Sequence, residues 1–315
     1  LLCCGCVLVY TKEVICKKMR DIVSAIHFSN GKIYVGNGTK ISVFDCESYE
    51  ELPEVDPGGR YIYSIASSLD GSVLYVACND GTGRCVDLAT RRVVTLSGHN
   101  GDVSCIIPGD DDVVFTCGED MTVRMWESQS GKNIKTFTGH GDRVYSLLYS
   151  GKKKQLFSGS TDKSIIIWNI HTGTQVGVMN GHSSAVCSLA WVDDTTIVSG
   201  SWDNTLKIWD TKSFTCLRTF SDHSDWVRSV ATTADGIFII SGSNDRTTKV
   251  WRTNDGECVH TLTHHSGSVY KVAVSADGRF LATGGNDKMF YLFGAEGGFA
   301  QVLHVFVCVY IIFMI

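Results

Sequence analysis

The chain has 315 residues, of which 43% are hydrophobic, and this is enough to build a large core. Its formal net charge of −5 implies no basic face, so composition gives no support for a nucleic-acid-binding surface. The 13 cysteines are odd in number and scattered, which predicts reduced thiols in a cytoplasmic protein, with the nucleus as an alternative. Thirty-two glycines against three prolines favour many strands joined by tight turns.

The first segment, residues 1–12, is apolar but does not begin with the basic region that a signal peptide has, so it is a poor signal peptide. Its first residue is Leu, which leads us to expect a fragment or a processed product. Cys3 and Cys6 have metal-ligand spacing, but no second pair completes a zinc site, and we expect no metal. A lipidated Cys3–Cys4 doublet stays open.

A repeat of 41 or 42 residues is the main signal of the chain. Each copy has a histidine, a valine four residues later, and an aspartate 21 or 22 residues after the histidine. A hydroxyl precedes each aspartate by four residues, and a large aromatic follows it by six. The five histidines are His99, His140, His182, His223 and His265.

The period fits four short strands and their turns. In the copy that ends at His182, strand-like runs lie at Val144–Tyr149, Gln155–Ser158, Ser164–Trp168 and Thr174–Val178, with turn residues between them. One four-stranded sheet cannot bury both of its faces alone. Radial packing of several such sheets solves this and leaves few free edges.

The runs "GHGDRV…SGSTDKSIIIWN" and "GHSSAV…SGSWDNTLKIWD" resemble the WD-repeat family, although only Trp209–Asp210 is a literal Trp-Asp pair. Two weaker repeats, which lack the histidine and the tryptophan, precede the five strong ones. The resemblance implies an all-β fold over residues 13–293, a seven-bladed WD-repeat β-propeller of four-stranded antiparallel blades. Its repeats are expected near residues 19–44, 58–87, 99–127, 140–169, 182–210, 223–252 and 265–294.

Propellers of this family usually close when one terminus lends an outer strand to the last blade. Here Glu13–Lys18 would pair beside the strand that ends at Phe293. Phe299–Val305 competes for this role, and an eight-bladed ring that uses both chain ends is a further alternative. The apolar tail 294–315 could form a strand, an irregular end, or the stub of a membrane anchor, although the run Val302–Ile315 is short for a span.

A histidine with an aspartate and a serine invites comparison with a catalytic triad, which needs one such group with an exposed nucleophile. Five copies at a fixed period favour a structural hydrogen-bond network instead, as the family resemblance implies. We therefore expect no catalytic residue and no cofactor. The expected network residues are His99, Thr116, Asp120, Trp126, His140, Ser158, Asp162, Trp168, His182, Ser199, Asp203, Trp209, His223, Ser241, Asp245, Trp251, His265, Thr283 and Asp287.

If the repeated residues are structural, function belongs to positions that vary between repeats. In this family, the residue after the valine and the residue before the aspartate commonly face the mouth of the central channel, and the residue before the valine lies close by. These positions are rich in Tyr, Trp and Arg, which are enriched in binding hot spots. The candidate partner-binding residues are Tyr63, Glu119, Arg143, Tyr145, Trp202, Trp226, Arg228, Asn244, Tyr270 and Asn286.

We therefore expect a non-enzymatic scaffold or adaptor that binds partner peptides of neutral or mixed charge at this mouth. The alternative is a substrate-recognition subunit of a ubiquitin ligase or of another multiprotein complex. No nucleic acid is expected as a partner, and the run Lys152–Lys154 should be a solvated turn. Membrane attachment rests on the C-terminal tail alone, and the sequence leaves the oligomeric state open.

Overall fold

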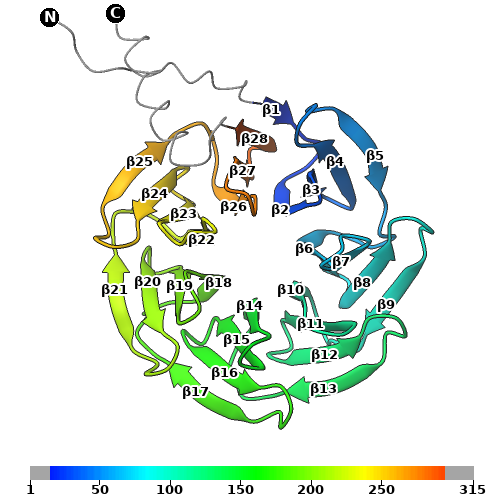
Figure 1. Ribbon diagram of the computed structural model, residues 1–315, viewed down its shortest axis with the longest axis horizontal. Helices are drawn as coiled ribbons and strands as arrows, with labels where there is room; N and C mark the ends of the chain where they lie inside the picture. Colours follow the sequence, from blue (N-terminus) through cyan, green and yellow to red (C-terminus); the bar gives the residue numbers. More distant parts are fainter. Residues whose placement is uncertain (1–14, 295–315) are drawn as a thin grey trace, which may run out of the picture.

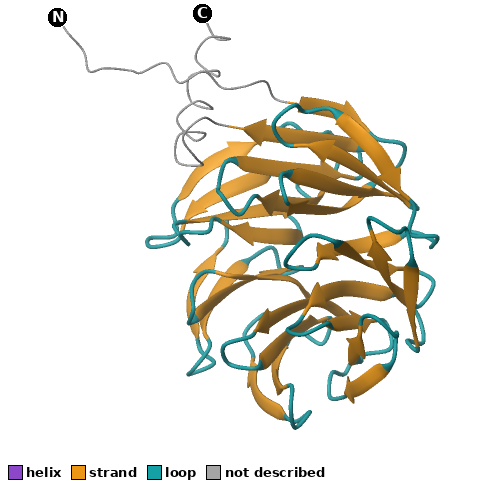
Figure 2. Cartoon of the chain, turned by 45° about the vertical axis from the view of Figure 1, so that its right-hand side comes forward, coloured by secondary structure: helices purple, strands orange, loops and turns teal. Residues whose placement is uncertain are grey.

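The computed structural model describes residues 15–294 as seven four-stranded sheets and, within this range, no helix. The sheets stand radially around a central axis (Figure 1), and strands and short loops make up the whole described chain (Figure 2). The prediction of an all-β, seven-bladed propeller is thus confirmed, and the eight-bladed alternative is wrong for the described residues.

Each blade begins at the channel and runs outward. The innermost strands are β2 (Val23–Ser29), β6 (Ile62–Ser67), β10 (Val103–Pro108), β14 (Val144–Ser150), β18 (Val186–Trp191), β22 (Val227–Thr232) and β26 (Val269–Val274). The second strands are β3 (Lys32–Asn37), β7 (Val73–Cys78), β11 (Val113–Gly118), β15 (Gln155–Ser160), β19 (Thr196–Ser201), β23 (Phe238–Ser243) and β27 (Phe280–Gly285).

The third and fourth strands complete the blades toward the rim, and every pairing is antiparallel. The third strands are β4 (Lys40–Asp45), β8 (Thr82–Asp87), β12 (Val123–Glu127), β16 (Ile165–Asn169), β20 (Leu206–Asp210), β24 (Thr248–Arg252) and β28 (Met289–Gly294). The outer strands are β5 (Glu51–Val55), β9 (Val93–Ser97), β13 (Asn133–Phe137), β17 (Gln175–Met179), β21 (Cys216–Phe220), β25 (Cys258–Leu262) and β1 (Ile15–Lys18).

The N-terminal strand closes the ring. β1 pairs antiparallel with β28, with Cys16 opposite Tyr291 and Lys18 opposite Met289. The last blade is therefore built from both ends of the described chain, which confirms the predicted closure by residues up to Lys18. The competing segment Phe299–Val305 and the tail beyond residue 294 lie outside the described residues.

At several interfaces neighbouring blades approach so closely that the second strand has a glycine, although Ala77 and Cys117 take this position in the second and third blades. A Cβ atom added at Gly200 would lie 2.9 Å from Cγ1 of Val227, and one added at Gly242 would lie 2.7 Å from Cγ1 of Val269. The same contact crosses the closing seam, where a Cβ at Gly284 would lie 2.1 Å from Val23. The repeat valine therefore packs into the space that the missing side chain leaves on the preceding blade.

In the five strong repeats, a buried chain of hydrogen bonds links the turn before the inner strand to the sheet. In the fifth blade, His182 Nδ1 lies 2.7 Å from Asp203, and His182 Nε2 lies 2.7 Å from Ser199 Oγ. The indole N–H of Trp209 donates to the same hydroxyl over 2.7 Å. The aspartate also accepts from the backbone N–H of Ser183, so its charge is held by several donors.

The other four copies repeat this arrangement, with one change. His99, His140, His223 and His265 each contact their aspartate and their hydroxyl residue, at distances between 2.6 and 3.1 Å. Trp126, Trp168 and Trp251 donate to the hydroxyls Thr116, Ser158 and Ser241. In the last blade Phe293 takes the place of the tryptophan, so Thr283 has no indole donor.

The first two blades hold the corresponding turns with different residues. In the first, Asn37 donates from Nδ2 to Ser42 Oγ over 2.9 Å. In the second, the Arg84 guanidinium lies 2.8 Å from Asp80 and also donates to the carbonyl of Pro57. Neither blade has a histidine between hydroxyl and carboxylate.

We expect the first two blades to open more readily than the central ones, because each buried hydrogen bond contributes about 0.5–1.5 kcal/mol. Amide hydrogen exchange should be faster in residues 20–90 than in residues 140–250. Uniform protection across these two ranges would contradict this expectation.

The network also predicts how stability depends on pH. Burial by itself would raise the pKa of Asp203, but hydrogen bonds from His182 and Thr205 outweigh it and hold that pKa well below its usual range. Asp120, Asp162 and Asp245 behave in the same way. A carboxylate with a lowered pKa in the folded state stabilises that state above the unfolded pKa of about 4, and this stability is lost as the pH falls toward the folded pKa.

Replacement of Asp203→Asn should therefore cost about 1–3 kcal/mol of unfolding free energy at pH 7. The difference from the unmodified chain should narrow as the pH falls from about 5 toward 2, since only the natural carboxylate is being protonated. Urea unfolding at several pH values measures this. Asp111→Asn, on an exposed turn, is the control and should follow the unmodified chain. If the difference in unfolding free energy between the two proteins stayed constant with pH, the Asp203 carboxylate would not be the cause of the lost stability.

Candidate functional site

A β-bulge at the start of each inner strand builds the mouth of the channel. In all seven blades the pairing with the second strand shifts by one residue directly after the repeat valine, or after Ile62 in the second blade. A bulge leaves its extra residue unpaired and redirects the side chain. The seven skipped residues are Ser24, Tyr63, Ser104, Tyr145, Cys187, Arg228 and Tyr270, and all of them line one cavity of about 250 Å³.

Four further residues complete the wall of this cavity: Tyr61, Arg143, Trp202 and Lys271. The mouth thus joins side chains from all seven blades, and most of them are aromatic or cationic. Among the residues predicted from the sequence, Tyr63, Arg143, Tyr145, Trp202, Arg228 and Tyr270 are brought together here. Glu119, Trp226, Asn244 and Asn286 do not line the cavity.

Trp226 and Asn244 contact the wall from outside and hold Arg228. The rings of Trp202 and Trp226 stack with their centroids 4.4 Å apart and their planes 8° from parallel. The Arg228 guanidinium lies 5.3 Å from the Trp202 ring centroid and 4.9 Å from that of Trp226. Arg228 Nε also donates to Asn244 Oδ1 over 2.8 Å, and Tyr270 lies on its other side at 5.2 Å.

Arg143 forms a second cluster on the other side of the mouth. Its guanidinium lies 3.4 Å from the Asp102 carboxylate and donates from Nε to Ser104 Oγ over 3.0 Å. The hydroxyl of Tyr63 donates to the same carboxylate over 3.1 Å. Because Asp102 already holds Arg143, this cation is less available to an added ligand than its position alone suggests.

Glu119 and Asn286 belong to the turns that surround the mouth. The Glu119 carboxylate accepts a hydrogen bond from the backbone N–H of Asp102 over 3.2 Å. The Asn286 side chain lies so close to Gly267 that a Cβ there would meet its Oδ1 at 2.0 Å. Glu119 thus hydrogen-bonds the backbone of a neighbouring turn, and Asn286 packs against the backbone of another.

Three tyrosines of the mouth keep their hydroxyl protons at neutral pH. Burial raises the pKa of Tyr61 to about 12, and burial also raises the pKa of Tyr63 and of Tyr145. Their hydroxyl groups are therefore hydrogen-bond donors, and that of Tyr63 already donates to Asp102.

Five residues of the wall are not among the predicted binding residues. Two of them, Ser104 and Cys187, occupy the position after the repeat valine that the sequence rule had marked, and the other three were missed. Ser24 follows the valine of the first repeat, so the rule applied to the stronger repeats finds it once Val23 is aligned with them. Tyr61 precedes the first inner-strand residue of the second blade, which has Ile62 in place of valine. Lys271 lies two residues after Val269, a position for which no role was assigned in any repeat.

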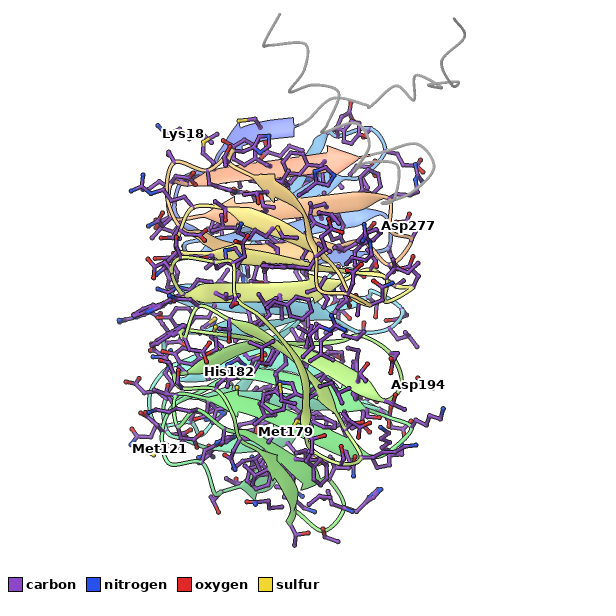
Figure 3. All side chains as sticks on the ribbon, turned by 90° about the vertical axis from the view of Figure 1, so that its left-hand side faces the viewer. Lys18, Met121, Met179, His182, Asp194 and Asp277 are labelled. Atoms are coloured by element: carbon purple, nitrogen blue, oxygen red, sulfur yellow. The ribbon has the colours of Figure 1, made fainter. Side chains whose placement is uncertain are left out.

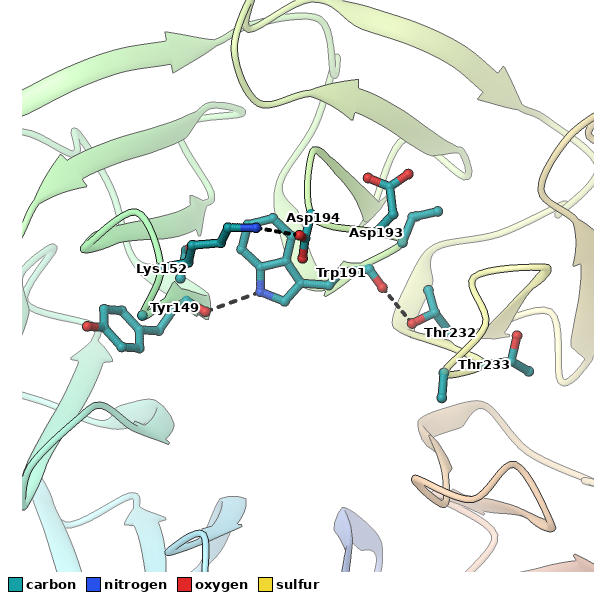
Figure 4. A pocket seen from close by; sticks show the side chains of 11 residues that line it. Tyr149, Lys152, Trp191, Asp193, Asp194, Thr232 and Thr233 are labelled. Carbon is teal, nitrogen blue, oxygen red and sulfur yellow. Dashed lines mark hydrogen bonds and ion pairs between the residues drawn. The ribbon is translucent and has the colours of Figure 1, made fainter.

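The opposite face of the ring has a second hollow, of about 470 Å³, at the far ends of the inner strands (Figure 4). Figure 3 shows Met121 at one face of the ring and Asp194 and Asp277 at the other. In this hollow the indole of Trp191 donates to the Tyr149 carbonyl over 3.2 Å, and Lys152 pairs with Asp194 over 2.8 Å. Both charged side chains are 79% exposed, so the predicted solvated turn is found at Lys152. Lys153 and Lys154 are half-buried and contact Thr211 and Asp110.

Within residues 15–294, no group of three or more His, Cys, Asp or Glu side chains could hold a metal ion. The same range contains no helix of the length and apolar character needed to cross a membrane. The Cys3–Cys6 pair, the Cys3–Cys4 doublet and the run Val302–Ile315 lie outside the described residues.

The two kinds of tryptophan should differ in their effect on stability. Trp209 is fully buried in the framework, whereas Trp226 is 38% exposed. Replacing Trp209 with Ala should cost about 3–5 kcal/mol of unfolding free energy, and replacing Trp226 with Ala about 1 kcal/mol, from the lost ring stack. Urea unfolding of both variants measures the difference. Equal losses would contradict the assignment of Trp226 to the surface of the mouth.

Comparison with known proteins agrees with this architecture. The family model described as "WD domain, G-beta repeat" matches residues 90–127, 131–169, 173–210, 214–252 and 256–293. Over 147 residues the chain is 29% identical to "Guanine nucleotide-binding protein G(I)/G(S)/G(T) subunit beta-1" of Homarus americanus and 27% identical to "Guanine nucleotide-binding protein subunit beta-1" of Drosophila melanogaster. A protein of the latter name from Caenorhabditis briggsae is 29% identical over the same length.

Each of these alignments covers 44% of this chain and 43% of the relative, so the matched part is less than half of each relative. The five matches to the family model together span more than half of the chain, and they end at the third strands of the five strong repeats. On this evidence the chain belongs to the WD-repeat family.

Proposed function

We propose that this protein is a non-enzymatic scaffold or adaptor that binds a peptide segment of a partner protein at the mouth of its channel. The observation that carries the proposal is the convergence of all seven bulge residues on one cavity. None of these side chains belongs to the buried network of histidine, aspartate, hydroxyl and tryptophan, although Ser24 and Cys187 each donate to a backbone carbonyl of the next blade.

The chemistry of the mouth suits a protein ligand. Tyr, Trp and Arg dominate hot spots of protein interfaces because they combine large contact area with hydrogen-bonding groups. Here Trp202, Tyr145 and Arg228 lie within one cavity. The Trp202 Nε1 group is buried and has no hydrogen-bond partner in the described chain, so an acceptor on a bound peptide would satisfy it.

An interaction role also agrees with the relatives, since each of them is named as a subunit of a guanine nucleotide-binding protein. A substrate-recognition subunit of a ubiquitin ligase would bind its substrate at the same mouth and would need a further domain to join it to the enzyme. The mouth alone does not distinguish this role from that of another adaptor, so we propose the more general role.

The repeated histidine, aspartate and hydroxyl residues are unsuited to catalysis. Their histidine side chains are at most 2% exposed. In four of the five copies the hydroxyl already accepts from a buried indole. A nucleophile must reach its substrate, and these hydroxyl groups lie inside the blades.

The proposal is tested with short peptides selected from a random phage-displayed library on the immobilised full chain. Trp202→Ala should weaken binding of the selected peptides about 10-fold or more, the effect of losing a hot-spot residue. Fluorescence polarisation with labelled peptides measures the affinity.

Trp191→Ala is the matched control, because Trp191 is also a tryptophan outside the buried network but lines the hollow on the opposite face. Its replacement should leave the affinity unchanged. If Trp191→Ala abolishes binding and Trp202→Ala does not, the opposite face is the binding surface and the proposal is wrong. Thermal unfolding of each variant shows that it remains folded.

A further inference from the structure

Lys271 interrupts a pattern that the other inner strands keep. Two residues after the repeat valine, each inner strand pairs with the same position of the second strand. The equivalent residues are Ala25, Ser64, Cys105, Ser146, Ser188, Ser229 and Lys271. A small side chain is present in every blade except the last.

In the central blades this small residue links one blade to the next. The hydroxyl of Ser146 accepts a hydrogen bond from the backbone N–H of Leu189 over 3.0 Å, and Ser188 accepts from Val230 over 3.0 Å. Ser229 accepts from Val272 over 3.2 Å. At the seam between the last and the first blade, a lysine replaces the linking serine, so the chain has a long cation where the framework uses a short hydroxyl.

The Lys271 ammonium group lies inside the ring of blades. Lys271 is half-buried and lines the mouth cavity. Burial and, second, the charge of Lys271 lower the pKa of His27 to about 4. Burial raises the pKa of Cys187 to about 12, and the charges of Arg228 and Lys271 oppose this rise. The charge of one lysine in the last blade thus affects pKa values in the first and fifth blades, as expected for a charge near the axis of the ring.

This cation has no counter-charge among residues 15–294, since the Lys271 side chain forms no hydrogen bond and no ion pair with any of them. Leaving a half-buried ammonium without a partner costs free energy, unless a ligand supplies the partner. None of the residues that line the cavity is Asp or Glu. The Asp102 carboxylate contacts two residues of the wall, but it pairs with Arg143 and accepts a hydrogen bond from Tyr63.

We infer that the mouth receives an acidic side chain, Asp or Glu, of the bound peptide, with the Lys271 ammonium group as its counter-ion. This inference rests on the proposed peptide-binding function and refines it, since the sequence alone led us to expect a ligand of neutral or mixed charge. The tyrosine hydroxyls of the wall can donate to the same carboxylate. A cavity of about 250 Å³ is small for a drug-sized ligand and suits one side chain.

A carboxylate fits this charge balance better than a phosphate group. A phosphorylated residue carries a charge of about −1.5 to −2 and favours several converging arginines. Of the two arginines of the mouth, Arg143 pairs with Asp102, and Arg228 is held by the neutral oxygen of Asn244 and by the rings of Trp202, Trp226 and Tyr270. The Lys271 ammonium group is the cation of the wall without a hydrogen-bond partner in the described chain, and one carboxylate satisfies it.

The test uses the same random-peptide library on the full chain, followed by synthetic peptides from the selected pool. The pool from the unmodified chain should be enriched in Asp or Glu at one position. A peptide with Gln or Asn at that position should bind about 10-fold more weakly, the loss expected for one charge-assisted contact. Fluorescence polarisation measures both peptides of each pair.

Lys271→Met keeps the length of the side chain and removes its charge, so the two peptides should then bind with similar affinity. Lys271→Arg should keep most of the preference for the acidic peptide. Lys152→Met is the matched control: it removes an exposed lysine on the opposite face and should leave the preference unchanged. Thermal unfolding shows that each variant keeps its fold.

Several outcomes would overturn the inference. The pool could lack acidic enrichment, or Lys271→Met could keep the preference. A peptide with phosphoserine in place of Glu could bind about 10-fold more tightly, which would assign the mouth to phosphate. If the selected peptides bind and Trp202→Ala weakens them but no acidic preference exists, the inference fails while the proposed function stands. If Trp202→Ala has no effect on them, both fail.

Discussion

The hydrogen-bond chain from aspartate through histidine and hydroxyl to tryptophan is the interaction on which the rest of the ring depends. It fixes the turn between the second and third strands against the turn that enters the inner strand, as with Asp203 and His182. The residue just before each aspartate is held by backbone as well: the N–H of Trp202 donates to the carbonyl of Ala185, and that of Asn244 to the carbonyl of Trp226, each over 2.9 Å. The framework thus sets the positions of the side chains next to it, and the mouth is rigid because the network beneath it is satisfied.

A second constraint separates what the ring must keep from what it can change. Glycines such as Gly200 and Gly242 admit the valine of the next blade, and directly after that valine the bulge releases one residue from strand pairing. The valine and the glycine are therefore restricted by contact distance, whereas the bulge residue is restricted by little except solvent and its neighbours. Seven bulge residues of four types result, among them Ser24, Cys187 and Arg228. Diversity at a fixed position is what a binding surface on a repeat scaffold requires.

This separation explains how far the sequence could predict the structure. The period, the strand content and the number of repeats followed from residues that recur, because recurrence reports the framework, whereas the closing strand was expected from the family resemblance. Four strand runs predicted between Val144 and Val178 lie within two residues of β14 to β17. The contacts of the mouth could not follow in the same way. The support that Trp226 and Asn244 give to Arg228 depends on the curvature that brings neighbouring turns together, and that curvature has no signal in the linear pattern. Lys271 was missed because no role was assigned to the position two residues after the repeat valine, where the other strong repeats have Cys105, Ser146, Ser188 and Ser229.

The last blade combines several departures from the framework. It has Phe293 where the third to sixth blades have tryptophan, it takes its outer strand β1 from the other end of the described chain, and it has Lys271 where the fourth to sixth blades have a serine that binds the next blade. The first and the third of these departures each omit a hydrogen bond that central blades have. The ring can tolerate this because the central blades keep theirs, and natural proteins tend to break local rules where function benefits. The bulge beside Lys271 explains how the charge reaches the mouth: Tyr270 is redirected into the mouth, and the next side chain enters the same cavity from the same strand. The closing blade thus has a cation on the wall of the mouth where the fourth to sixth blades have an inter-blade hydrogen bond.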